Sequence, residues 1–492
     1  MYMKHLPIVI AVLGLIPRCI HLTNTNYYIL GLDSYLFHYL AQHPHDPMIT
    51  NDGYPLHIGI TYLIYLCAHI IGITAASCTI PIVIYLITYM LLYWFTKRYF
   101  GPIVALATVA IWSLTPQAVL ITSSGYLDRD GISVFLILMA LILMIVSIHK
   151  TWLCMIIGLI GVIGISICQW VQWHLVGALL TSSIAILVIG CRIIQPQMTK
   201  LLLLSIIVLV YGATYVAIDI MGVNTDAVGE MQPVRLADIF LYFSWAVPLI
   251  VIGVVIVYKK PDFVSSIVVI WVVSVLASAG VVSRVLVFTL PAVCILAGIT
   301  VGYSLQRYRD IGGYQTLSNR WGVGAMGIIA AVLVITSVVT TNTLQTNHRM
   351  SPNTDWVAAL EYLAHETPND ALIGCMANHS YWVLDIGERI PVNRGDHRGY
   401  TDSICELYCA TNIEQFYNIM SDMGCDYVIA STWEYEAEYP IQRLMTVSGI
   451  HSKKGESILY NSLYSTELLP TVYRNDTVII IPYLAVPSQK IT

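Results

Sequence analysis

Long apolar stretches separated by short polar segments fill the first two thirds of the chain. A helix that crosses a bilayer needs about 20 apolar residues. The pattern predicts eleven such spans, at 6–22, 77–96, 102–121, 132–148, 152–169, 175–191, 201–220, 239–258, 264–282, 285–305 and 322–340. The apolar segment 56–74 is expected to lie at the membrane interface or to re-enter from one face, because a full crossing would mix basic residues between the two sides.

The pattern changes after residue 340. Residues 351–367 place apolar side chains at helical spacing behind a capping residue, and 426–431 alternate as a strand does. We therefore predict an α-helical polytopic membrane domain at 1–340, followed by a mixed α/β soluble domain at 341–492.

Composition supports this division. Hydrophobic residues make up 57% of the chain and charged residues 11%, about half the charged share of a typical soluble domain. Residues 341–492 hold 18 of the 29 acidic and 9 of the 24 basic residues. The net charge of -5 provides no broad basic surface for phosphates. These values exclude a cytosolic globular enzyme, a disordered chain and a nucleic-acid binder.

Basic residues predict the orientation in the membrane. With eleven spans, one side carries Lys4, Lys97, Arg98, Lys150, Arg192, Lys200, Lys259, Lys260, Arg307, Arg309 and Arg320. The other side carries Arg129, Arg235 and Arg284 before residue 341. The positive-inside rule then places the N-terminus in the cytoplasm and the C-terminal domain outside the cell membrane.

Acidic residues gather on the outer side. Nine of the eleven in residues 1–340 lie there under this topology, while Asp262 and Asp310 lie inside. Carboxylates from several helix ends on one face are the ligands that a hard divalent cation requires.

Four outer segments carry candidate chemistry. Asp33 lies in GLDSYLFHYL (31–40), Asp128 and Asp130 form a D-x-D pair, Glu230 lies in NTDAVGEMQP (224–233), and Arg284 lies at the mouth of a span. Each has an ordinary alternative: a solvated acid, a helix cap or an interfacial arginine. A D-x-D pair also suits a magnesium or manganese ion that bridges to substrate phosphates.

Together, and in this order, the segments resemble the catalytic subunit of the oligosaccharyltransferases, especially the archaeal single-subunit type of the GT-C class. The resemblance rests on Asp33-Ser34-Tyr35, on Gly125-Tyr126-x-Asp128-x-Asp130, on Ala227 to Pro233 with Glu230, and on the Arg284 segment. It continues in SYWVLDIGERIPV (380–392) and GCDYVIASTWE (424–434). It implies a GT-C membrane domain of about 11–13 spans.

One family signature is altered. The WWDYG motif of the soluble domain is replaced by Met376-Ala377-Asn378-His379-Ser380, unless WVLDIG (382–387) takes its place after an insertion. In the family this motif grips the acceptor hydroxyl, so the resemblance gives that role to Asn378 and His379. The arginine often found seven residues before the first aspartate of the D-x-D pair is Ile121 here.

The resemblance also implies a reaction. A glycan would pass from a polyprenyl (dolichyl) phosphate or diphosphate to an asparagine of an exported polypeptide. Asp33 and Glu230 would hold the acceptor amide, and Asp33, Asp128, Asp130 and Glu230 would hold a divalent cation, Mn²⁺ or Mg²⁺. Arg284 would bind the lipid phosphate.

Two alternatives remain open at this point. A related GT-C enzyme would transfer a sugar from a polyprenyl phosphate to serine, threonine or a lipid. A non-catalytic paralogue would bind the carrier lipid or nascent chains without transfer.

Overall fold

The chain forms two compact units, each described by itself. The computed structural model describes residues 5–19, 29–43, 58–127, 129–148, 236–260, 262–279, 283–310, 335–341, 351–376, 379–392, 401–435, 457–465 and 468–484. The first unit, called the helical unit, contains the helices of residues 1–348 except α2. The second, called the sheet unit, contains α2 and the residues from 349 onward.

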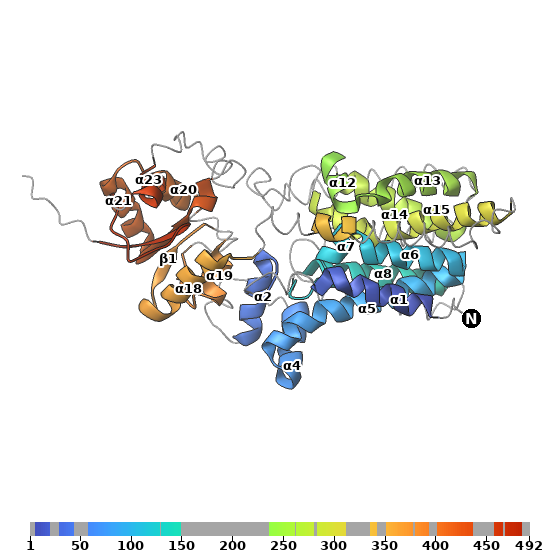
Figure 1. Cartoon of the computed structure of the whole chain (residues 1–492), viewed down its shortest axis with the longest axis horizontal. Coiled ribbons are helices and arrows are strands. Elements are labelled where there is room, and N and C mark those ends of the chain that lie inside the picture. The colour runs from blue at the N-terminus through green and yellow to red at the C-terminus, as the bar shows by residue number, and fades with distance from the viewer. Residues whose placement is uncertain are drawn as a thin grey trace, which may run out of the picture. The chain divides into compact units, whose positions relative to one another are not determined.

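Apolar helices lie side by side in the helical unit (Figure 1). They are α1 (Leu6–Cys19), α4 (Ile58–Ile71), α5 (Ile73–Phe100), α6 (Pro102–Leu114), α7 (Pro116–Leu120), α8 (Arg129–Ile148), α12 (Leu236–Phe243), α13 (Ala246–Lys259), α14 (Phe263–Ala279), the 3-10 helix η4 (Ser283–Thr289) and α15 (Leu290–Asp310). Two stretches, Ile73–Phe100 and Leu286–Arg307, are long and apolar enough to cross a membrane by length and composition. The described part of this unit is helical, as predicted.

Several predicted spans are divided. The span expected at 102–121 is α6 and α7, because Pro116 lacks the N–H that would continue the helix. The span expected at 239–258 is α12 and α13, with Ser244 between them at φ 48°. The spans expected at 152–169, 175–191 and 201–220 lie outside the described residues, as does the part of the 322–340 span before residue 335, so the number of spans stays a prediction.

The apolar segment 56–74 contains the short helix α4. Its 14 residues extend about 21 Å at 1.5 Å per residue, less than the hydrocarbon core of about 30 Å. Gly72, at φ +82°, then turns the chain into α5. The helices α1 and α13, expected to span the membrane, are equally short, so the interfacial or re-entrant position of 56–74 stays a prediction.

Small residues bring the central helices close together. On α15, a methyl group added to Gly298 would collide with the hydroxyl of Thr108 on α6 and lie 3.0 Å from the Thr108 Cα and N. One turn later, Gly302 faces Val104 in the same way. Packing through small residues is how helices associate where the solvent is itself apolar.

The sheet unit is built on five strands. They are β1 (Leu372–Gly374), β2 (Ile390–Pro391), β3 (Tyr427–Ser431), β4 (Tyr473–Arg474) and β5 (Val478–Pro482), in the order β2-β1-β3-β5-β4. β1 pairs in parallel with β2 and β3, and β5 pairs antiparallel with β3 and β4. The sheet therefore contains both parallel and antiparallel pairs, which were not predicted from the sequence.

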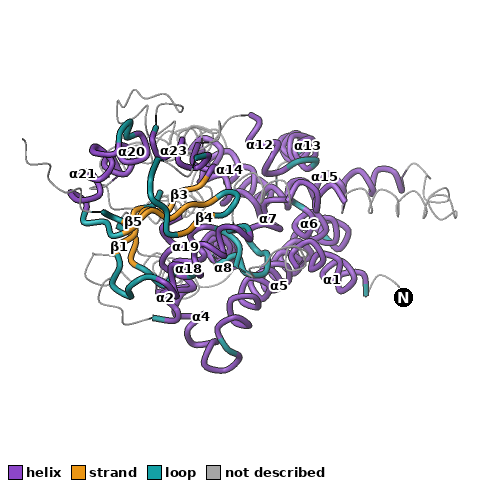
Figure 2. The backbone as a smooth tube through the Cα atoms, turned by 60° about the vertical axis from the view of Figure 1, so that its left-hand side comes forward, coloured by secondary structure: helices purple, strands orange, loops and turns teal. Residues whose placement is uncertain are grey.

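Helices cover both faces of this sheet (Figure 2). They are α2 (Leu32–Gln42), α18 (Thr354–Glu366), α19 (Ser380–Asp385), α20 (Thr401–Cys409), α21 (Ile413–Met423), η6 (Thr432–Tyr435) and α23 (Ile458–Tyr464). Along β3, Val428 and Ala430 enter the core that contains α20, α21 and α23, while Ile429 enters the core that contains α18 and α19. This is the alternation that predicted a strand at 426–431.

The predicted amphipathic helix of 351–367 is α18. Asn353 caps it by accepting a hydrogen bond from the backbone N–H of Trp356 at 2.9 Å. The four cysteines of the sheet unit, Cys375, Cys405, Cys409 and Cys425, are buried and free. Burial raises the pKa of Cys425 to about 12 and that of Cys409 to about 11, which keeps both thiols neutral.

The contact between α15 and α6 gives a stability prediction. Gly298→Ala is expected to lower the melting temperature of the purified chain in detergent, because the new methyl group forces the two backbones apart at a cost of about 1–3 kcal/mol. Ser304→Ala, on an exposed position of the same helix, serves as the control and should not change it. An unchanged melting temperature for Gly298→Ala would mean that the helices do not touch at Thr108.

Candidate functional site

The seven predicted site residues are described to different extents. Asp128, Glu230 and Asn378 lie outside the described residues. Asp33 lies in the first turn of α2 and Arg284 in η4, but their side chains are not described. Asp130 is half-buried in the first turn of α8, and His379 is buried. Within the described ranges no three His, Cys, Asp or Glu side chains gather to hold a metal ion, so the four-carboxylate site stays a prediction.

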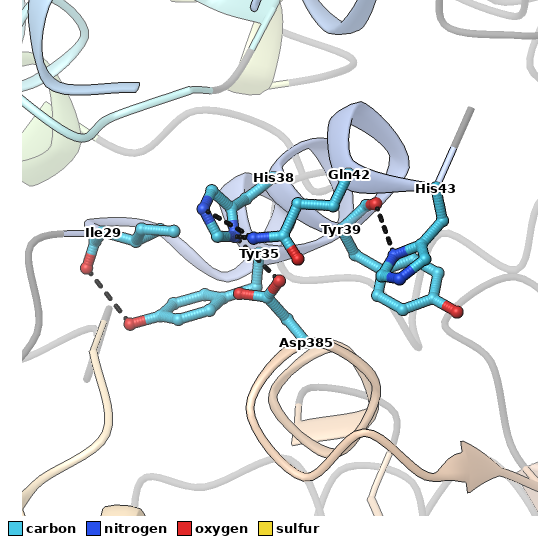
Figure 3. A network of polar contacts seen from close by, with 7 residues as sticks. All are labelled: Ile29, Tyr35, His38, Tyr39, Gln42, His43 and Asp385. Carbon is cyan, nitrogen blue, oxygen red and sulfur yellow. Dashed lines mark hydrogen bonds and ion pairs between the residues drawn. The ribbon is translucent and has the colours of Figure 1, made fainter. Parts of the chain in front are cut away.

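Two residues of the Asp33-Ser34-Tyr35 motif make hydrogen bonds to the chain just before it. The Ser34 hydroxyl donates to the Leu30 carbonyl at 2.7 Å. The Tyr35 hydroxyl donates to the Ile29 carbonyl at 3.1 Å (Figure 3). Gly31 allows the turn before α2, since its φ is 101°. The residues on either side of Asp33 thus lock the start of the helix that carries it, where the helix dipole favours a carboxylate.

A buried ion pair joins α2 to α19. His38 Nδ1 lies 2.8 Å from Asp385 Oδ1, and the two side chains are 6% and 2% exposed. Gln42 lies one turn further along α2 with its side-chain amide 3.2 Å from His38 Nε2 (Figure 3). Burial raises the pKa of Asp385 above its ordinary value, and the hydrogen bond with His38 offsets part of that rise. The pair ties the helix of Asp33 to the helix that follows the altered acceptor motif.

His379 belongs to a second buried pair. Its Nδ1 lies 2.9 Å from Glu434 Oε1, and neither side chain is exposed. The imidazole stacks on Trp382 at 4.8 Å between ring centroids and lies 4.5 Å from the Trp356 ring. The other oxygen of Glu434 accepts from the Ser431 N–H at 2.8 Å, at the end of β3. His379 therefore fastens the end of the altered motif to the sheet.

The approach to the D-x-D pair is equally well anchored. After α7 the chain turns through Gly125, at φ 77°, and reaches Asp128 and α8. A methyl group on Gly131 would lie 2.5 Å from the Ile121 carbonyl, so the first turn of α8 packs directly on the end of α7. Asp130 is thus held close to a rigid turn.

Three residues with structural importance here were not singled out from the sequence as site residues. His38 and Asp385 are 347 positions apart, and nothing local connects them. Arg18 is fully buried near the end of α1. For Arg18 the sequence does hold a signal, since an ionisable residue inside an apolar helix is a default candidate for function.

Comparisons with known proteins agree with the fold. No protein-family model and no curated protein matches the chain. Among solved structures it is similar to the archaeal oligosaccharyltransferase AglB from Archaeoglobus fulgidus in complex with an inhibitory peptide and a dolichol-phosphate, with a TM-score of 0.66 and 13% identity over 91% of this chain and 72% of that one. The oligosaccharyltransferase resemblance drawn from the motifs is confirmed at the level of the fold.

Two further structures extend the comparison. The same Archaeoglobus fulgidus enzyme in complex with Zn and sulfate matches with a TM-score of 0.57 and 13% identity, over 87% of this chain and 68% of that one. ArnT from Cupriavidus metallidurans, bound to undecaprenyl phosphate, matches with a TM-score of 0.51 and 12% identity, over 99% and 98%. The chain thus has the fold of GT-C glycosyltransferases.

The His38–Asp385 pair gives a second stability prediction. Asp385→Ala leaves His38 buried without its partner and is expected to cost about 3 kcal/mol. The melting temperature should fall, while the exposed Glu361→Ala on α18 should leave it unchanged. Equal melting temperatures for the two variants would show that the pair does not stabilise the sheet unit.

The pair also gives a pH prediction. Because the folded-state pKa of Asp385 is raised above 3.8, its stabilising contribution is complete below that value and is lost as the pH rises through the folded-state pKa. Asp385→Asn removes this titration. The difference in melting temperature, wild type minus Asp385→Asn, should therefore fall as the pH rises from 3.8 through the raised folded-state pKa. A difference that stays constant across this range would contradict the raised pKa.

Proposed function

We propose that the chain is a multi-pass membrane enzyme that transfers a glycan from a polyprenyl (dolichyl) phosphate or diphosphate to an asparagine of an exported polypeptide. The observation that supports this best is the order of the motifs within a shared fold. Asp33, the D-x-D pair, Glu230 and Arg284 follow one another as in the oligosaccharyltransferases, and the AglB match covers 91% of the chain.

The proposed orientation follows from the charges. The N-terminus lies in the cytoplasm, and the sheet unit lies outside the membrane, where it meets exported acceptors. The enzyme works as a single subunit. Its donor substrate is a lipid in the bilayer, as suggested by the dolichol-phosphate and the undecaprenyl phosphate in the structures of AglB and ArnT.

The reaction needs an amide nitrogen to act as a nucleophile, although its lone pair is delocalised. In the proposal, Asp33 and Glu230 accept the two N–H bonds of the acceptor amide and turn it out of conjugation. The nitrogen then forms a bond to the sugar C1, the bond from C1 to the phosphate oxygen breaks, and the amide proton passes to one of the carboxylates. Arg284 holds the departing lipid phosphate.

The donor set of Asp33, Asp128, Asp130 and Glu230 suits a hard divalent cation, because all four offer carboxylate oxygens. A bound Mn²⁺ or Mg²⁺ would neutralise charge on the leaving phosphate. Half-burial of Asp130 next to the turn at Ile121 supports a fixed ligand there. The Zn complex of AglB is a further point in favour of a metal.

In the altered motif, we assign different roles to His379 and Asn378. His379 is enclosed by Trp356, Trp382 and Glu434, so we assign it to holding the segment in place. Asn378 is then the side chain proposed to contact the acceptor hydroxyl. An amide binds a hydroxyl without the charge assistance that an aspartate gives.

The second candidate is a GT-C enzyme that transfers a single sugar to serine, threonine or a lipid. The ArnT match favours it, because it covers nearly the whole of both chains. A non-catalytic paralogue is the third possibility and would show no product with any acceptor.

A transfer assay separates these candidates. Membranes from cells that express the chain, supplied with total lipid extract, a peptide library and Mn²⁺, should yield glycopeptides linked through asparagine. Asp128→Ala and chelation should each lower the yield by about 100-fold or more. Glu361→Ala is the control and should transfer normally.

Three outcomes would contradict parts of the proposal. Transfer that survives both chelation and Asp128→Ala excludes the metal role. Products linked through serine, threonine or lipid favour the second candidate. No product with any acceptor favours the non-catalytic paralogue.

A further inference from the structure

Arg18 is buried in the helical unit with every donor occupied. Its Nε donates to Thr122 Oγ1 at 2.8 Å. One terminal nitrogen donates to the carbonyls of Gly14 at 2.6 Å and Ser113 at 2.9 Å. The other donates to those of Trp112 at 3.4 Å and Ala118 at 3.3 Å. A guanidinium has five N–H bonds, so none is left for a lipid phosphate or a substrate.

Three of the four accepting carbonyls, those of Trp112, Ser113 and Ala118, lie on either side of the break between α6 and α7, while the Gly14 carbonyl belongs to α1. Pro116 has no N–H, so the Trp112 carbonyl lacks its helical donor. At the end of α7, the Thr122 N–H bonds to Val119 instead of Ala118, and the Ala118 carbonyl accepts from the Thr122 hydroxyl and from Arg18. Arg18 thus satisfies the Trp112 and Ser113 carbonyls, which the broken helix would otherwise bury unpaired, and fastens Thr122 at the end of α7.

The positive charge is balanced by dipoles and an aromatic ring. The Arg18 guanidinium lies 3.7 Å from the centroid of the Tyr85 ring, and the Tyr85 hydroxyl lies 2.9 Å from Ser113 Oγ. No carboxylate of the described residues pairs with it. Burying a cation in an apolar bundle is costly. The arginine at this position therefore indicates that the surrounding carbonyls need hydrogen-bond donors, which an apolar side chain lacks.

The turn that Arg18 holds, at 121–125, comes shortly before the D-x-D pair in the chain. The backbone N–H of Ser124 donates to the Arg18 carbonyl at 3.0 Å, and the Ser124 hydroxyl donates to the Cys78 carbonyl at 3.1 Å. From Ser124 the chain reaches Asp128 in four residues. On the far side of the pair, Gly131 rests on the Ile121 carbonyl.

We propose that Arg18 is a positioning residue that sets the place of Asp128 and Asp130, and through them the affinity for the divalent cation. The inference rests on the proposed function, in which this pair holds the ion. Arg18 acts through the α6–α7 break and the turn at 121–125, without touching the ion or the substrates.

The test is Mn²⁺ binding by the purified full-length chain in detergent, followed by electron paramagnetic resonance. Arg18→Lys keeps the charge but has three donors instead of five, so the turn loosens. The dissociation constant for Mn²⁺ should rise about 10-fold or more, as for other residues that orient metal ligands. Transfer should fall by a similar factor at limiting Mn²⁺ and recover at saturating Mn²⁺.

Arg389→Lys is the matched control. Arg389 is also buried and donates to carbonyls, those of Ala364 at 2.8 Å and Thr367 at 2.6 Å, but at the end of α18 in the sheet unit. Its replacement should leave the affinity for Mn²⁺ unchanged. Thr122→Val removes the acceptor of Arg18 Nε with little change in shape, and it should weaken Mn²⁺ binding even if Arg18→Lys fails to fold.

The outcomes separate this inference from the proposed function. If the wild type binds Mn²⁺ and a folded Arg18→Lys and Thr122→Val bind it equally well, the positioning role is wrong and the metal role stands. If Arg389→Lys weakens binding as much as Arg18→Lys does, the effect is general destabilisation, which also overturns the inference. If the wild type binds no Mn²⁺, the metal role fails and the inference falls with it.

Discussion

The bonds between one guanidinium and the carbonyls of a broken helix are the interaction on which the helical unit depends most. The break between α6 and α7 leaves carbonyls without backbone donors inside an apolar environment. From a different helix, Arg18 donates to three of these carbonyls and to the Thr122 hydroxyl. Arg389 meets the same need at the end of α18. In both places a cation stabilises the C-terminal end of a helix, where the helix dipole favours positive charge.

Much of the architecture could be predicted from the sequence because it depends on local patterns. The apolar runs give the helices, and the alternation at 426–431 gives β3, whose neighbours Val428 and Ile429 enter opposite cores. The divisions within the spans were harder to predict. Pro116 is visible in the sequence, but a proline in an apolar run is compatible with one kinked helix or two separate ones, and packing decides between them.

The residues of the candidate site could be predicted from the sequence, but the residues that hold their helices in place could not. Carboxylates in outer loops are conspicuous in an apolar chain, so Asp33 and the D-x-D pair stand out. The partners that hold their helices do not. His38 meets Asp385 across 347 residues, and Arg18 meets Thr122 across 104. Such contacts are set by the tertiary fold and leave no periodic pattern. His379 is the opposite case. The motif predicted it as a site residue, but its side chain is enclosed by Trp382 and Glu434.

The membership of α2 in the sheet unit has a practical consequence. Ile29 and Tyr35 are fully buried in the same core as Trp356 and Trp382, so a fragment that begins at residue 341 would expose a tryptophan-rich surface to water. Excision of the C-terminal region for crystallisation or antibody production therefore requires residues 29–43 as well, either fused through a linker or added as a separate peptide.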